Sequence, residues 1–174
     1  MHYNETEKWH DFSYRGRNYD LSHLNAKKLS FTDPKNGKTY TFFVTYSFHC
    51  FAKDSDDLTL LERQELMYSA PRDKRPFHFE RYHDSTKLPE IINNLPNCHT
   101  FDAGYEKSAL IHIFDESGRK IYYKIVFKAY REEKKLRLHI ETAHRVSSLE
   151  KTKPRGFFVI AKNALLGKPL KSNP

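Results

Sequence analysis

The sequence predicts an α+β protein: an N-terminal β region, then a helix followed by an antiparallel β-meander of three or four strands. Residues 38–51, KTYTFFVTYSFHCF, are dense in aromatic and β-branched side chains, which is typical of a strand. Residues 84–95 carry an apolar stripe with i, i+3, i+4, i+7 spacing, which indicates a helix: Leu88, Ile91, Ile92 and Leu95. From residue 109 onward the hydrophobic period changes to two, and this order of elements favours the α+β class.

Turn-forming residues divide the first 80 residues. Gly16 lies within 12–24 and predicts a short hairpin or a turn, and the Asp33-Pro34 and Asn36-Gly37 pairs predict a turn before the long strand. Residues 57–67 are expected to form a short helix and residues 69–76 a loop.

Residues 81–174 are expected to form a helix and a β-meander. Asp84 or Ser85 can cap the helix, and Pro96 closes it. Short turns join strands expected at 109–114, 121–130 and 136–146, so neighbouring strands should be antiparallel. Residues 157–160 predict either a fourth strand or the start of a terminal helix. We expect one domain over residues 1–174, with the β region and loop in 1–80 and the helix plus basic meander in 81–174.

Composition and charge limit the function classes. The chain has 174 residues, 38% hydrophobic and 14% aromatic, which is enough for a core without disulfides. The net charge is +8, and residues 119–174 hold 15 Lys+Arg against 4 Asp+Glu, whereas residues 1–118 hold 15 against 18. This asymmetry predicts a face for a polyanion, RNA or DNA, with plain solubility as the alternative.

The chain lacks the features of secreted and membrane proteins. No apolar run reaches the roughly 20 residues of a membrane span, and MHYNETEKWHDF has no apolar leader. Two cysteines, Cys50 and Cys98, cannot build a disulfide framework. We therefore expect a cytoplasmic protein with free thiols and no membrane partner.

Motifs of several enzyme classes are missing from the sequence. It contains no P-loop, G-x-G-x-x-G, G-x-S-x-G or H-E-x-x-H. His49 and Cys50 are adjacent on the expected strand and should point to opposite faces, so His49 is badly placed to activate the thiol. The sequence has no C-x₂-C pair of the kind that a zinc site would use, and Cys98, His99 and His112 could share a metal only through tertiary packing, so neither a metal nor another cofactor is expected.

Alternation along the last two meander strands predicts a basic sheet face. In the absence of a bulge, this face would carry the nucleic-acid-binding candidates Lys124, Lys128, Arg137, His139 and Arg145. Tyr122 and Tyr130 lie between them and could stack bases. The alternative is an ordinary solvated sheet face, on which mixed charges are common.

Four residues are candidates for catalysis: His49, Arg81, Thr142 and His144. Thr142 and His144 fall on the row expected to face the core, so they are either hydrogen-bonded structural groups or the floor of a cleft. Arg81 precedes the expected helix cap, where the helix N-terminus attracts phosphate; the alternative is an exposed loop. RNA cleavage by its own 2′-OH needs a base, an acid and cations, which these residue types supply.

Several segments of the chain look familiar together: residues 19–24 (YDLSHL), 47–51 (SFHCF), 81–82 with Ser85 and Leu88-Pro89, 142–144 (TAH) and 156–168. In these segments the chain resembles a group of small, uncharacterised bacterial proteins labelled "stationary phase growth adaptation". The expected helix and meander, with the Thr142-x-His144 pair on its last strand, are also similar to the barnase/EndoU/colicin/RelE-like ribonuclease fold. That looser resemblance implies Thr142 and His144 as site residues, and a toxin or phage-conflict role.

Two function hypotheses follow. The first is an RNA-binding protein that acts as a metal-independent endoribonuclease of the toxin or phage-conflict type. The alternative is a non-enzymatic nucleic-acid or protein interaction module, such as a regulator or an antitoxin-like partner. The expected partners are nucleic acid, with RNA favoured, and a protein such as an antitoxin.

Overall fold

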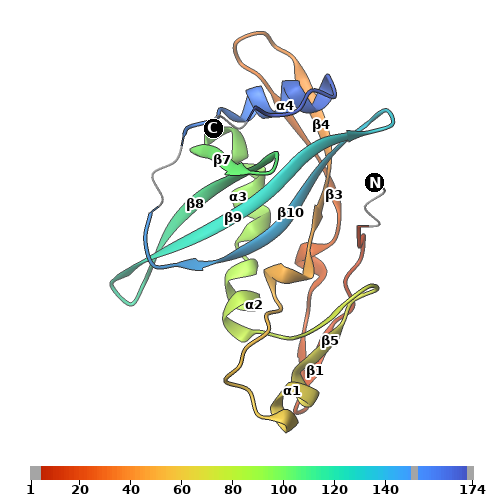
Figure 1. Cartoon of the computed structure of the whole chain (residues 1–174), viewed down its shortest axis with the longest axis vertical. Coiled ribbons are helices and arrows are strands. Elements are labelled where there is room, and N and C mark those ends of the chain that lie inside the picture. The colour runs from red at the N-terminus through yellow and green to blue at the C-terminus, as the bar shows by residue number, and fades with distance from the viewer. Residues whose placement is uncertain (1–4, 150–152, 172–174) are drawn as a thin grey trace.

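The computed structural model describes residues 5–149 and 153–171, and its centre is a six-stranded sheet (Figure 1). The strand order is β3-β4-β10-β9-β8-β7. The strands span Lys27–Thr32 (β3), Thr39–Tyr46 (β4), Thr100–Gly104 (β7), Lys107–Glu116 (β8), Arg119–Glu132 (β9) and Lys135–Val146 (β10). Neighbours are antiparallel except β4 and β10, which pair in parallel. The α+β class is confirmed, whereas the parallel pair that joins the two halves of the chain was not predicted.

Helices cover one face of this sheet. α2 (Phe79–Ser85) and α3 (Leu88–Asn93) run behind strands β8–β10 in Figure 1, and α4 (Phe157–Leu165) crosses near the top. The apolar stripe of the helix predicted over residues 84–95 does form a helix, α3, with Leu88, Ile91 and Ile92 buried, but the predicted start is wrong. Asp84 and Ser85 lie inside the separate helix α2, which begins earlier because His78 caps it: its Nδ1 accepts the Arg81 N–H at 3.3 Å. The terminal helix forms instead of a fourth strand, and its Phe157 ring meets Phe31 edge-on at 5.0 Å.

The remaining elements form a smaller layer at the lower end of the molecule (Figure 1). The expected hairpin around Gly16 forms from β1 (Phe12–Tyr14) and β2 (Arg17–Tyr19). The expected short helix is α1 (Leu60–Leu66), which a capping box at Thr59 starts. The loop expected at 69–76 is the end of a second hairpin, β5 (Met67–Ser69) with β6 (Lys74–Pro76).

The long strand expected over 38–51 ends early, at Tyr46. Residues Phe48–Cys50 form a 3₁₀ turn, η2, because the Ser47 side chain accepts the His49 N–H at 3.2 Å. The Ser47 N–H still bonds the Ile140 carbonyl at 2.8 Å, so this turn lies beside β10. His49 and Cys50 are therefore on a turn next to the sheet and not on a strand.

A β-bulge in β10 decides which way its side chains point. Ile140 pairs with Phe127, and the next pair along the ladder is Thr142 with Val126. Glu141, between Ile140 and Thr142, therefore has no partner on β9 and is the extra residue of the bulge. Before the bulge Leu136, Leu138 and Ile140 face the helices; after it, the buried Ala143 does. The placement of Thr142 and His144 on the core-facing row is therefore wrong: both lie opposite the helices, in register with Val126 and Lys124.

The same bulge turns Arg145 toward the helices, which corrects its expected place on the basic face. Its guanidinium binds both carboxylate oxygens of Asp84 on α2, at 2.7 and 3.0 Å. Asp84 is 1% exposed, and Glu116 adds a further pair at 2.7 Å. Arg145 thus fixes α2 to the sheet and neutralises a buried carboxylate.

Replacing Arg145 tests this anchoring role. Arg145→Met should lower the free energy of unfolding by about 3 kcal/mol, because it leaves Asp84 buried without a counter-charge. Urea unfolding measures the effect, and Lys120→Met at the exposed start of β9 is the control, expected within about 0.5 kcal/mol of wild type. Adding Asp84→Leu to Arg145→Met should recover part of the loss. An Arg145→Met protein as stable as the control would contradict the assignment.

Candidate nucleic-acid interface

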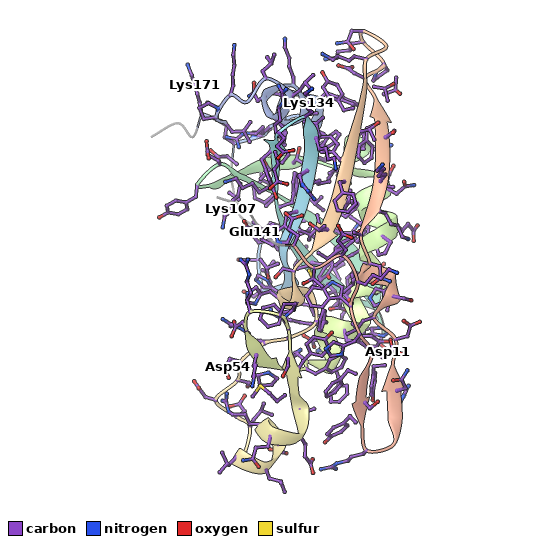
Figure 2. The ribbon with its side chains drawn as sticks, turned by 90° about the vertical axis from the view of Figure 1, so that its right-hand side faces the viewer. Asp11, Asp54, Lys107, Lys134, Glu141 and Lys171 are labelled. Carbon is purple, nitrogen blue, oxygen red and sulfur yellow. The ribbon has the colours of Figure 1, made fainter. Side chains whose placement is uncertain are left out.

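The sheet face opposite the helices, here called the outer face, carries the other four binding candidates with their partners. Arg137 pairs with Glu132 at 2.7 Å and Lys128 with Glu106 at 3.7 Å. Next to them Lys107 pairs with Glu141, the bulge residue, and Figure 2 shows these two side chains close together. The positive charge predicted for the centre of this face is thus largely compensated within the protein.

Glu5, which the sequence did not single out, lies over this face and is only 3% exposed. It accepts hydrogen bonds from the Tyr130 and Thr45 hydroxyls. His139 Nδ1 lies 3.5 Å from the Glu5 carboxylate and 2.9 Å from the Thr45 hydroxyl. Burial lowers the pKa of His139. His139 is therefore enclosed by the N-terminal segment and does not face a polyanion directly.

Arg81 differs from the other arginines discussed so far. It lies inside α2 and not before its cap, and its Nη1 donates to the carbonyls of His49 at 2.9 Å and Ala52 at 3.4 Å. Within the described residues no carboxylate forms an ion pair with it. Burial lowers the pKa of Arg81, although a guanidinium stays charged at any ordinary pH. A partly buried cation held only by carbonyls can accept an anionic ligand.

Both predicted catalytic histidines lie within electrostatic reach of Arg81. Burial lowers the pKa of His144, and Arg81, Lys124 and Lys53 lower it further. Burial also lowers the pKa of His49, with Arg75 and Arg81 acting in the same direction. We call Arg81, His49, His144, Lys53 and Lys124 the Arg81 cluster. It combines cations with imidazoles that are neutral near pH 7.

Thr142 adds a hydroxyl to this cluster. Its Oγ1 lies 3.3 Å from His144 Nδ1. When Nδ1–H donates to Thr142, Nε2 keeps a free lone pair and can accept a proton. Arg81 thus acts electrostatically on both His49 and His144, and Thr142 lies beside His144. Lys128, Arg137, His139 and Arg145 instead lie beside carboxylates of the protein.

Sequence reasoning missed Lys53 and Tyr123 as neighbours of this cluster. Lys53 follows η2, and only the packing of this turn against β10 brings it near His144. Tyr123 is fully buried, and its hydroxyl finds no hydrogen-bond partner in the part of the chain that is described. Burial raises the pKa of the Tyr123 phenol, with Cys50, Asp84 and Arg81 nearby. No local sequence pattern marks such tertiary neighbours.

The Cys50 thiol is a poor nucleophile here. It is completely buried, and burial raises its pKa to about 12. Over residues 5–149 and 153–171, no three His, Cys, Asp or Glu side chains are grouped to hold a metal ion. Over the same residues, no helix is long and apolar enough to cross a membrane.

The fold and this cluster define a basic α+β protein with a cationic edge beside its sheet. The chain belongs to the YjaZ family, whose model matches residues 11–165. It is 42% identical over 171 residues to "Protein YjaZ" from Escherichia coli (strain K12), covering 95% of this chain and 96% of that protein. No solved structure matches the chain.

Proposed function

We propose that the protein binds RNA along the Arg81 cluster and cleaves it there without a metal ion. One observation carries this proposal: Arg81 is partly buried, forms no ion pair within the described residues, and acts on the imidazoles of both His49 and His144. A phosphodiester supplies the negative charge that such a group attracts, and RNA also supplies a nucleophile in its 2′-OH.

Each group has a place in this chemistry. His144 Nε2 takes the proton of the 2′-OH as the oxygen attacks phosphorus, and Thr142 holds the imidazole through Nδ1. Arg81 and Lys124 stabilise the extra negative charge of the phosphorane. His49 is the second imidazole of the cluster, and in its protonated form it donates a proton to the leaving 5′-oxygen. Because the pKa of His49 is also lowered, cleavage is fastest below pH 7, where part of the His49 population is charged while part of the His144 population is still neutral. The products are a 2′,3′-cyclic phosphate and a free 5′-hydroxyl, so no water is consumed in this step.

RNA affinity should fall steeply with salt. If about five phosphates are neutralised, the log–log slope for a single strand is about −3.5. Arg81→Gln should weaken binding and reduce the slope by about 0.7, because one phosphate contact is lost. Fluorescence anisotropy of labelled single-stranded RNA at several salt concentrations measures both quantities.

Lys35→Gln is the matched control, since it removes one charge from the exposed β3–β4 turn. It should leave the slope unchanged, and circular dichroism should show that Arg81→Gln is folded. An equal loss of RNA affinity in the two variants would mean that binding depends on the overall charge of the protein and not on the Arg81 cluster. An RNA affinity that does not change with salt concentration would contradict the proposal.

His144→Ala should reduce cleavage in EDTA by about 10²-fold, the usual effect of losing a general base. Because His144 is only half-buried, the free energy of unfolding should change by less than about 1 kcal/mol. The wild-type rate should persist as pH falls to values below the ordinary histidine range, since only the neutral imidazole acts as base and its pKa is lowered. Gel analysis of RNA cleavage against pH, with urea unfolding alongside, measures these effects.

His112→Ala is the control for this experiment, because His112 is also partly buried and lies on β8. It should cleave like wild type. A folded wild-type protein could bind RNA with the expected salt slope and yet cleave none. That result would contradict the cleavage proposal and favour the alternative, a non-enzymatic interaction module. Cleavage retained by His144→Ala would remove His144 from the mechanism.

A further inference from the structure

A second cationic site lies at the other end of β10, in a cleft of about 470 Å³. The parallel ladder of β4 and β10 begins only at Phe42–Leu136, so Thr39–Thr41 of β4 have no β10 partner. Thr39–Thr41 on one side and Lys134 and Lys135, at the turn between β9 and β10, on the other line the cleft. In Figure 2 its Lys134 lies toward the upper end of the sheet, above Lys107 and Glu141.

Three lysines from two separate segments line this cleft: Lys28, Lys134 and Lys135. None of them forms an ion pair with a carboxylate of the described residues. Glu7 is the one carboxylate in the lining, and the remaining cation, Arg137, is already paired with Glu132. The cleft therefore carries a net charge of about +2, which suits the charge of about −2 on a phosphomonoester near pH 7.

The walls also fit a planar body attached to the phosphate. The Arg137 guanidinium lies over the Phe43 ring at 5.0 Å, so one guanidinium face is backed by an aromatic ring. A nucleobase can stack on such a plane. Leu136 and Leu165 add apolar surface. Thr39 and Thr41 also line the cleft; their hydroxyls already bond those of Thr32 at 2.8 Å and Ser30 at 2.7 Å, and each can make one further bond to a ribose. A volume of about 470 Å³ is larger than a phosphate ion needs and lies within the range of small-ligand pockets.

We infer that this cleft binds a nucleoside monophosphate. The phosphate lies among Lys28, Lys134 and Lys135, and the base lies against Arg137. This inference does not rest on RNA binding at the Arg81 cluster, which is near the opposite end of β10.

Isothermal titration of the full chain with AMP tests the inference, with adenosine and inorganic phosphate as separate ligands. AMP should bind saturably, inorganic phosphate more weakly, and adenosine not at all. The double variant Lys134→Gln/Lys135→Gln should weaken AMP binding by about tenfold or more, because charge-assisted contacts are lost. Arg119→Gln/Lys120→Gln, which removes the same charge from the exposed start of β9, should bind AMP like wild type.

Three results would overturn the inference. They are no saturable AMP binding, adenosine binding as tight as AMP binding, or equal AMP affinity in the two double variants. RNA binding measured on the same proteins separates the two sites. If Lys134→Gln/Lys135→Gln loses RNA affinity as strongly as AMP affinity, the cleft belongs to an RNA surface and the nucleotide assignment fails.

Discussion

The β-bulge at Glu141 is the constraint on which the rest of the arrangement depends. One extra residue in β10 exchanges the two faces of the strand beyond Ile140. Arg145 thereby reaches the buried Asp84 and holds α2 against the sheet. His144 turns in the opposite direction, and the position of α2 sets the position of Arg81. A regular strand would place His144 in the core and Arg145 in solvent, and both the anchoring pair and the Arg81 cluster would be lost.

Charge compensation explains why a basic chain exposes little free positive charge at the centre of its sheet. Carboxylates from Glu5, Glu106 and Glu132 are placed against the cations of β9 and β10. Near each end of β10, cations are left without a carboxylate partner among the described residues. At one end Arg81 is held by carbonyls, and at the other three lysines line a cleft without ion-pair partners among the described residues. The function argued for each end follows from this uneven distribution.

Local sequence signals predicted much of the fold and less of the site. The meander strands, the Gly16 hairpin and the β3–β4 turn follow from alternation and turn chemistry, which are local. The parallel β4–β10 pair and the early start of α2 depend on tertiary contacts and on a His78 cap, an uncommon capping residue. The faces of Thr142, His144 and Arg145 were assigned wrongly because nothing in LRLHIETAHRV marks the bulge. The likeness to the ribonuclease fold and the stationary-phase label stay predictions.

Proton titration of His144 by NMR tests the central claim most directly, because it reports on the Arg81 cluster without requiring turnover. In the free protein the His144 imidazole should titrate below the ordinary histidine range, since burial and three cations oppose its charged form. Adding a short RNA whose 2′-OH groups are methylated, so that it cannot be cleaved, should raise the pKa of His144, because the bound phosphate favours the imidazolium. The pKa of His112 on β8 should not move. A His144 pKa in the ordinary histidine range in the free protein would contradict the account. So would a His144 pKa that does not change when RNA is added, if anisotropy shows that the RNA is bound.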